Sequence, residues 1–417
     1  MNKLTIRDLD LTGKRVLMRV DFNVPLKDGQ VTDDTRIMKA LPTIEHALSN
    51  GARSVVLMSH LGRPKGKPNP EFSLKHVADY LATQTTAPVS FASDCVGEDV
   101  KAQIEALPPG GVLLLENVRF YAEEEGKAKL GDDATDEEKA AAKAEMKEKQ
   151  LTFAKQLAEL GDVYVNDAFG AAHRSHASTA VVTKFFDQNA AGLLLEKEIA
   201  YLGGALANPD RPFVAILGGA KISGKIDVIT NLIGKVDALL IGGGMTYTFF
   251  AAKGLPVGKS LVEEDKIELA KEIMDQAAAA GAKLLLPVDH VIADAFSADA
   301  NHEVVGEDGI KDGWLALDIG PESVKLYAAE IAGAKTVVWN GPMGCFEMAP
   351  FAAGTLGVAQ AVADADCVSI IGGGDSVSAV NKSGLADKMT HISTGGGASL
   401  EFLEGKALPG VTSLTDK

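Results

Sequence analysis

The stretch GGAKISGKI, residues 218–226, contains most of a phosphate-binding loop. Counted from Gly219 it reads G-x-x-x-x-G-K, a pattern whose backbone N–H groups and lysine hold nucleotide phosphates. A Ser or Thr should follow, because its hydroxyl binds Mg²⁺, but Ile226 occupies that position. An additional lysine, Lys221, lies inside the loop. The stretch therefore predicts phosphate binding, with the metal ligand elsewhere in the chain.

Glycine clusters end the apolar runs throughout the second half of the chain. They stand at residues 218–220, 242–244, 372–374 and 395–397. Backbone amides exposed by glycine bind phosphate without side chains, particularly where a helix begins. A single GGG would be weak support, because glycine also serves turns and close packing. In STGGGASLEFLEG, however, the glycines precede a short helical stretch, so several N–H groups should face a ligand ahead of it.

Three charged positions complete this predicted phosphate site. Asp375, in GGGDS, could bind Mg²⁺ together with nucleotide phosphates, although Asp at this position could equally be a helix N-cap. Lys221 and Lys225 are four residues apart, so on an early helical turn they would share a face and straddle a phosphate chain. Glu347, the last residue of WNGPMGCFE, is a candidate for binding a ribose hydroxyl.

Arginines mark the ends of the apolar runs in the first half. If the strands are parallel, their ends converge, and guanidinium groups without carboxylate partners would form a site for a phosphate or carboxylate. His173 and His176 lie in the same stretches, but a third metal ligand at suitable spacing is missing. Asp21 and Asn23 add acceptors for hydroxyls, so the expected ligand is small, acidic and hydroxylated. The five arginines are Arg19, Arg36, Arg63, Arg119 and Arg174.

The elements that must position these residues follow one pattern along the chain. Apolar, β-branched runs of strand length alternate with stretches of helical periodicity, which predicts α/β architecture with parallel sheets covered on both faces. The residues that end these apolar runs are charged or polar up to about residue 187 and glycine-rich later in the chain. Residues 191–207 are typical of an amphipathic helix between two lobes. A length of 417 residues also favours two domains, and we place them at 1–187 and 188–401.

Composition narrows the function further. The chain is 46% hydrophobic and 24% charged, as in globular proteins, and its net charge of −16 argues against a general nucleic-acid or anionic-membrane binder. The sequence shows no secretory signal and no apolar run of about 20 residues. Three dispersed cysteines fit reduced thiols in the cytosol. Residues 123–150 are highly charged and predict a solvated surface helix with a capping box at Thr135 and Glu138.

Eight motifs in order resemble the phosphoglycerate kinase family over essentially the whole chain: RVDFNVP, SHLGRP, ENVRF, DVYVNDAFGAAHRSH, LGGAKISGK, WNGPMGCFE, GGGDS and STGGGA. The resemblance implies reversible phosphoryl transfer from 1,3-bisphosphoglycerate to MgADP, giving 3-phosphoglycerate and MgATP. It implies two Rossmann-like three-layer αβα domains, a helical hinge, and a tail, residues 402–417, that packs back onto the first domain. It also implies a cytoplasmic monomer.

The resemblance assigns roles residue by residue. Arg36 and Lys221 would contact the transferring phosphoryl group together with the amides of Gly395, Gly396 and Gly397, and Asp375 would bind Mg²⁺. The phosphoglycerate would be bound by Asp21, Asn23, Arg36, His60, Arg63, Arg119 and Arg174. The nucleotide would be bound by Gly219, Lys221, Lys225, Gly243, Ala316, Glu347, Gly373, Gly374, Asp375 and Ser376. Ser376 replaces a usual Thr, and Ala316 replaces a frequent Gly near the adenine.

Two other functions fit the sequence less well. A dinucleotide-dependent dehydrogenase should show G-x-G-x-x-G and an acidic ribose ligand about twenty residues later, and no stretch does so cleanly. A nucleotide-binding protein without activity would be expected to have lost Arg36, Lys221 or Asp375, and all three are present. Phosphoryl transfer needs positioning and charge neutralisation more than covalent help, which fits these residues. We therefore expect domain closure to bring the two halves of the site together.

Overall fold

The computed structural model describes residues 2–131 and 133–417. Residues 1 and 132, which fall in the expected first domain, lie outside the described residues. The chain forms two compact units, Met1–Ala200 with Ala407–Lys417, and Tyr201–Lys406. The first unit extends beyond the expected boundary at residue 187 because residues 189–191 form a further strand of its sheet. The expected tail is divided, since residues 402–406 group with the second unit.

The first unit is built on a six-stranded sheet in which every pair of neighbours is parallel. Its spatial order is β5-β6-β4-β1-β7-β8. The strands are β1 (Arg15–Arg19), β4 (Ser54–Met58), β5 (Val89–Phe91), β6 (Gly111–Leu114), β7 (Val163–Asn166) and β8 (Asn189–Ala191). Because all strands run the same way, the loops after β1, β4, β6 and β7 leave the sheet at one edge. This edge holds the predicted arginine-rich stretches.

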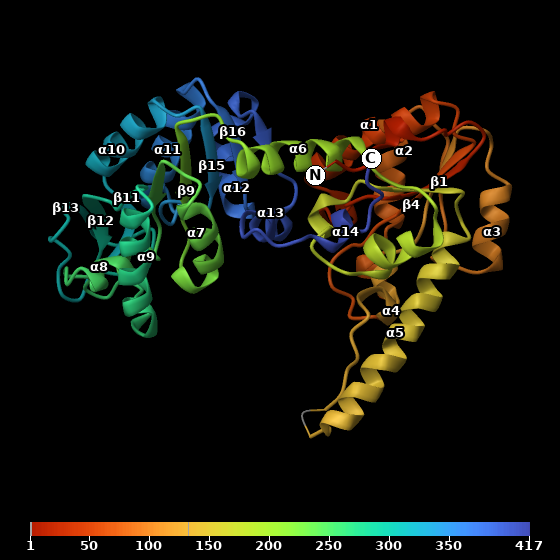
Figure 1. Cartoon of the computed structure of the whole chain (residues 1–417), viewed down its shortest axis with the longest axis horizontal. Helices are drawn as coiled ribbons and strands as arrows, with labels where there is room; N and C mark the ends of the chain where they lie inside the picture. Colours follow the sequence, from red (N-terminus) through yellow and green to blue (C-terminus); the bar gives the residue numbers. More distant parts are fainter. Residues whose placement is uncertain (1, 132) are drawn as a thin grey trace. The chain divides into compact units, whose positions relative to one another are not determined.

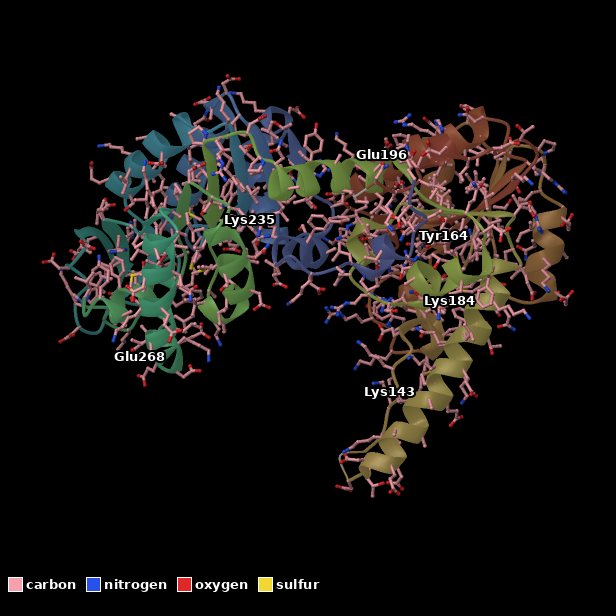
Figure 2. All side chains as sticks on the ribbon, in the orientation of Figure 1. Lys143, Tyr164, Lys184, Glu196, Lys235 and Glu268 are labelled. Atoms are coloured by element: carbon pink, nitrogen blue, oxygen red, sulfur yellow. The ribbon has the colours of Figure 1, made fainter. Side chains whose placement is uncertain are left out.

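Helices cover both faces of this sheet. Helices α1 (Thr35–Ser49) and α2 (Lys75–Gln84) pack on one face, where Val16 and Met18 of β1 contact a common apolar core. The other face carries α5 (Asp136–Ala158) and a π-helical turn, η5 (Ala177–Val181). Figure 2 labels Tyr164 of β7, whose hydroxyl donates to the carbonyl of Ser178 at 2.9 Å. Shorter helices are α3 (Glu98–Glu105), α4 (Ala122–Glu125) and α14 (Pro409–Thr412).

The charged segment forms the predicted helix. The amino-terminal half of α5 extends away from the rest of its unit (Figure 1), and Lys143 lies on this projecting part (Figure 2). The capping box is confirmed: the Thr135 hydroxyl accepts from the Glu138 N–H at 3.2 Å, and the Glu138 carboxylate accepts from the Thr135 N–H at 2.8 Å. Residues of α5 become buried only near its carboxyl end, where Phe153 and Leu157 reach the sheet.

A buried carboxylate caps the helix that leaves the first unit. Helix α6 (Leu193–Ala207) begins two residues later than expected, and Oδ1 of Asp167 accepts from the N–H groups of Leu194 and Leu195 at 2.9 and 3.1 Å. A side chain at Gly192 would collide with this carboxylate, so glycine is required for the close approach. Burial raises the pKa of Asp167 to about 6. The two backbone hydrogen bonds and a further hydrogen bond from the Thr43 hydroxyl lower the pKa, but burial outweighs them.

We predict a pH dependence of stability from Asp167. Between its ordinary value of 3.8 and about 6 the folded chain holds a proton that the unfolded chain releases, so stability falls as pH rises through this window. The loss amounts to about 3 kcal/mol. In urea unfolding at pH 4.5 and 7.5, Asp167→Asn should therefore gain about 2–3 kcal/mol relative to the parent chain at the higher pH. Asp187→Asn, at an exposed position, is the control, and parallel profiles for parent and Asp167→Asn would contradict the prediction.

The second unit contains a six-stranded parallel sheet in the order β11-β10-β9-β15-β16-β17. Its strands are β9 (Phe213–Leu217), β10 (Ala238–Ile241), β11 (Lys283–Leu285), β15 (Thr336–Asn340), β16 (Val368–Gly372) and β17 (His391–Ile392). The chain winds outward from β9 in one direction and from β15 in the other. Ligands of such doubly wound sheets bind beyond the carboxyl ends of the strands where the winding reverses, here between β9 and β15.

The helices of the second unit lie on both faces of this sheet (Figure 1). Helices α10 (Pro321–Ala332) and α11 (Ala353–Asp364) share one apolar core with Val214, Val337 and Trp339 of the strands. Helices α7 (Ile226–Ile233) and α9 (Ile267–Ala279) pack together on the other face. The remaining helices are α8 (Thr246–Ala252), α12 (Gly374–Ser383) and α13 (Gly396–Leu403). The predicted architecture of three layers around a parallel sheet is confirmed.

A small antiparallel sheet was not predicted. It has the order β13-β12-β14 and consists of β12 (Asp289–Ala293), β13 (His302–Gly306) and β14 (Leu315–Ile319). Strand β13 is exposed at every second residue, so its sequence lacks the continuous apolar run that marks the parallel strands. A separate apolar cluster beneath this sheet includes Tyr247, Phe250 and Ala316. No helix within residues 2–131 or 133–417 is long and apolar enough to cross a membrane.

Candidate functional site

In the first unit, the residues after β1 form a rigid base for Arg36. The Arg36 guanidinium donates to the Asn23 carbonyl at 2.8 Å and to the Asp21 carboxylate at 3.3 Å. Arg36 lies in the first turn of α1 and not at a strand end as predicted, and its side chain keeps 33% of its surface exposed. One side of the guanidinium is thus held in place while its other donors remain open to a ligand.

The loops after β4 and β6 are tied to this base through Gly62. Its N–H donates to the Asn23 side-chain oxygen at 2.9 Å, and its carbonyl accepts from the Arg119 guanidinium at 2.9 Å. A carboxylate oxygen of Glu125 lies 3.7 Å from Arg119 Nε. These contacts join three of the predicted substrate-binding residues, Asn23, Arg36 and Arg119, in one network around the edge of the sheet.

The guanidinium groups of two arginines have no hydrogen bond or ion pair with any residue that the structure describes. Arg63, after β4, and Arg174, after β7, are both exposed. The prediction that all five arginines present free guanidinium groups is wrong for Arg19, which is fully buried and bonded to Ser178 at 2.8 Å. It also needs correction for Arg36 and Arg119, which have carboxylate neighbours. The available guanidinium donors are therefore those of Arg36, Arg63, Arg119 and Arg174.

The lowered pKa values of two histidines indicate a positive electrostatic potential in this region. His60 is buried, and burial together with Arg19, Arg119, His176 and Arg36 lowers its pKa well below the ordinary value. Arg19 donates to His60 Nδ1 at 3.1 Å, and since arginine cannot accept, His60 must be neutral with its proton on Nε2. Burial, Arg174, His176 and Arg119 lower the pKa of His173 to about 4. A second neutral histidine thus lies in a field that favours an anionic ligand.

In the second unit, Lys225 and Asn340 meet where the winding of the sheet reverses. The Lys225 ammonium donates to the Asn340 side-chain oxygen, and burial lowers the lysine pKa to about 8 against the opposing effects of Glu404 and Asp375. The Asn340 side chain is 3% exposed, and its amide nitrogen has no acceptor among the described residues. Asn340 was missed in the sequence, although it is the last residue of the apolar strand β15.

Lys221 and Lys225 do not share a helical turn as predicted. A 3-10 turn, Ile222–Gly224, separates them, and Lys225 directly precedes α7. Lys221 is exposed and has no hydrogen bond or ion pair with the described part of the chain. Gly219, two residues earlier, has φ of +123°, and Gly218 packs so closely on Gly341 and Pro342 that no side chain would fit. The loop is therefore held tightly at its start, while the Lys221 side chain is free to reach a ligand.

Asp375 is not the N-cap of its helix. Gly373, with φ of +85°, is the N-cap of α12, and no side chain caps this helix. Asp375 lies within the first turn, exposed, and its carboxylate has no bonded partner in residues 2–131 and 133–417. Ser376 follows it, and its buried hydroxyl accepts from the Gly341 N–H at 2.6 Å. Gly373 and Gly374 contribute backbone at the same helix start.

The last glycine cluster forms the start of α13, with Gly395 as its N-cap. The Gly395 N–H donates to the Ser393 hydroxyl at 3.1 Å, so this amide is already occupied. The amides of Gly396 and Gly397 belong to the first turn, where a helix leaves its N–H groups without acceptors. Two of the three predicted amides are consequently available to an anion.

The remaining predicted nucleotide contacts lie in loops of the parallel sheet and in the antiparallel sheet. Gly243, with φ of +71°, follows β10 and donates its N–H to the Met343 carbonyl at 2.8 Å. Glu347 is exposed in the loop after β15. Ala316 is buried in β14, and its N–H donates to the Ser260 hydroxyl at 3.0 Å. Among the residues that the structure describes, no group of three His, Cys, Asp or Glu side chains is arranged to hold a metal.

Comparisons with known proteins agree over the whole chain. The family model described as phosphoglycerate kinase matches residues 6–406. The chain is 57% identical to a phosphoglycerate kinase of Chloroherpeton thalassium and 58% identical to one of Moorella thermoacetica, in both cases over 100% of each chain. Among solved structures it is similar to phosphoglycerate kinase from Coxiella burnetii, with 41% identity, a TM-score of 0.84, and coverage of 99% of this chain and 98% of that one.

Proposed function

The chain belongs to the phosphoglycerate kinase family, and from this premise we propose how its residues divide the work of phosphoryl transfer. It is a phosphotransferase that moves a phosphoryl group reversibly between 1,3-bisphosphoglycerate and ADP, giving 3-phosphoglycerate and ATP. The observation that carries the proposed division is the contrast between the units. Free guanidinium groups gather in the first unit, whereas lysines and helix-start amides gather in the second.

We propose that the first unit binds the phosphoglycerate. Arg63, Arg119 and Arg174 would bind its phosphate, since guanidinium groups match phosphate oxygens in geometry and charge. His60 would donate from Nε2, and Asp21 and Asn23 would bind the hydroxyl and carboxyl groups. The Arg36 donors that remain open would reach the acyl phosphate.

We propose that the second unit binds the nucleotide. Lys225 and Asn340 would bind phosphate oxygens, because the partly buried lysine and the buried asparagine are both donors at the reversal point of the sheet. Lys221 and the amides of Gly396 and Gly397 would neutralise the equatorial oxygens of the transferring group. Gly219, Gly243, Gly373 and Gly374 would provide close backbone contact, Glu347 would bind the ribose, and Ala316 would line the adenine pocket.

The reaction needs no general base in this scheme. A β-phosphate oxygen of ADP attacks the transferring phosphorus, the bond from phosphorus to the acyl oxygen breaks, and the leaving oxygen becomes the carboxylate of 3-phosphoglycerate. Both oxygens are already deprotonated in the corresponding substrate, so the protein only aligns them and stabilises charge. Exclusion of water protects the acyl phosphate from hydrolysis.

We propose that Asp375 binds Mg²⁺ together with the nucleotide phosphates. Its exposed, unpaired carboxylate fits a metal that takes one or two carboxylates and several phosphate or water oxygens. When bound, Mg²⁺ supplies charge neutralisation on the phosphates. Asp375→Asn should raise the Mg²⁺ concentration for half-maximal activity by about tenfold. Magnesium titration of initial rates measures this, with Asp387→Asn as the exposed control, and an unchanged midpoint would reject the assignment.

We propose that the two units approach each other when both substrates are bound. The support is that phosphoglycerate candidates belong to one unit and nucleotide candidates to the other, whereas transfer requires their ligands to meet. Solution scattering should show a smaller radius of gyration with 3-phosphoglycerate and MgATP together than with either alone. The enzyme is further proposed to act as a cytoplasmic monomer, as the family resemblance implies, and light scattering should give the mass of one chain.

The activity itself is tested by the acyl phosphate. Incubation of the protein with ATP, Mg²⁺ and 3-phosphoglycerate in the presence of hydroxylamine should form a hydroxamate in proportion to ADP. Omission of 3-phosphoglycerate controls for ATP hydrolysis by a contaminant. Folded protein that forms no hydroxamate would overturn the proposed function.

A further inference from the structure

A buried carboxylate lies behind the phosphoglycerate site without touching it. Glu124, in the short helix α4, is 0% exposed, whereas its neighbours Glu123 and Glu125 reach the surface. Burial raises its pKa, but His176, Arg19 and Ser178 together outweigh this effect and hold the pKa of Glu124 below its ordinary value. Glu124 is therefore a buried anion whose partners all come from the region around the substrate site.

The carboxylate of Glu124 fixes the π-helical turn η5. It accepts from the Ser178 N–H at 2.9 Å and from the Ser178 hydroxyl at 2.6 Å. Nδ1 of His176, which has no hydrogen bond of its own among the described residues, lies 3.6 Å from the same carboxylate. Helix turns of the π type are rare and need such tertiary support. The turn begins three residues after Arg174, so Glu124 also anchors the segment that carries this arginine.

The Ser178 hydroxyl passes this anchoring on to His60. Because it donates to Glu124, its oxygen is directed to accept from Arg19 Nε at 2.8 Å. Arg19 also donates to the Val20 carbonyl and to His60 Nδ1, the latter at 3.1 Å. The last contact leaves the His60 proton on Nε2, the nitrogen available to a ligand. A continuous chain of hydrogen bonds thus runs from Glu124 through Ser178 and Arg19 to His60.

We propose that Glu124 is a positioning residue of the phosphoglycerate site, which acts through Ser178 and Arg19 on the orientation and tautomer of His60 and through η5 on Arg174. The proposal rests on the phosphoglycerate site described under the proposed function. A carboxylate is suited to this task because it accepts both Ser178 donors at once and its negative charge attracts the Arg19 guanidinium, so Arg19 is held where it contacts His60 Nδ1. A glutamine has no charge and only one acceptor oxygen, so it holds Ser178 and Arg19 less firmly and weakens the Arg19 contact that keeps the His60 proton on Nε2.

The test compares Glu124→Gln and Ser178→Ala with the parent enzyme. Both variants should raise the KM for 3-phosphoglycerate by about tenfold or more, while the KM for ATP stays within about twofold. In proteins labelled with ¹⁵N-histidine, His60 should change from a single Nε2–H tautomer to a mixture. Glu123→Gln, a change in the same short helix, is the control and should alter neither quantity.

The results distinguish the role of Glu124 from that of His60. If the KM for 3-phosphoglycerate and the His60 tautomer remain those of the parent in both variants, the positioning role is overturned. If Glu124→Gln does not fold, Ser178→Ala decides alone, since it leaves the carboxylate in place. His60→Ala is measured in parallel. If this change alters the KM for 3-phosphoglycerate while Glu124→Gln and Ser178→Ala do not, only the role of Glu124 is rejected. If His60→Ala leaves this KM unchanged, His60 is rejected as a ligand, and the proposal is rejected with it.

Discussion

Replacing Arg36 with alanine is expected to lower kcat by about a hundredfold to a thousandfold and to raise the KM for 3-phosphoglycerate. The Arg36 guanidinium is already fixed by the Asn23 carbonyl at 2.8 Å and the Asp21 carboxylate at 3.3 Å, so its open donors point from a rigid base. A charge that is positioned before the reaction costs no reorganisation when negative charge moves to the phosphoryl oxygens. The alanine variant loses both that charge and its geometry.

Two further variants distinguish charge from geometry at this position. Arg36→Lys keeps the charge but cannot reproduce two parallel N–H donors, so kcat should recover only in part. Arg53→Ala removes an exposed arginine paired with Glu105 at 3.3 Å and should leave the kinetics unchanged. Steady-state rates with both substrates varied provide the measurement. A loss in Arg36→Ala confined to the KM for 3-phosphoglycerate would show that Arg36 binds substrate without stabilising the transition state.

The parallel sheets were predictable because their strands are buried on both faces. In β4 and β9 every residue is buried, and a continuous apolar run such as FVAIL is typical of a parallel strand covered by helices on both faces. The antiparallel strand β13 escaped prediction for the opposite reason, since HEVVG is half exposed. Periodicity of the sequence therefore predicts the elements whose burial is complete and misses those whose burial is partial.

Whether a side chain at a strand end is buried or exposed could not be predicted in the same way. Arg19 and Arg63 both follow apolar strand residues, yet Arg19 is fully buried and Arg63 is exposed. The difference arises from Ser178, 159 residues away in sequence, which accepts from Arg19 across the sheet face. Which polar group lies opposite an arginine is decided by tertiary packing, and a single sequence contains no local signal for it.

The nucleotide side illustrates both cases. The glycine clusters predicted helix starts, because only glycine permits the positive φ of +85° at Gly373 and the close approach to Asn340. Asn340 itself could have been found, since a polar residue that ends a fully buried strand lies at the carboxyl end of the sheet, where ligands bind. Glu124 could not, because the run of three glutamates in which it stands is typical of a solvated surface.

Lys221→Ala is expected to reduce kcat by about a hundredfold or more while changing the KM for the nucleotide by less than about threefold. Lys221 is exposed, and its ammonium has no bonded partner among the described residues. A flexible, unpaired ammonium can follow a phosphoryl group that moves between two oxygens, which the partly buried Lys225, bonded to Asn340, cannot do. Lys225→Ala should therefore raise the nucleotide KM instead. Lys271 is an exposed helix lysine paired with Glu268 at 2.7 Å, and Lys271→Ala should leave both constants unchanged.

If Lys221→Ala raises only the KM, the residue binds the ground state, and the charge on the transferring group must be neutralised by Arg36 and the amides of Gly396 and Gly397 alone.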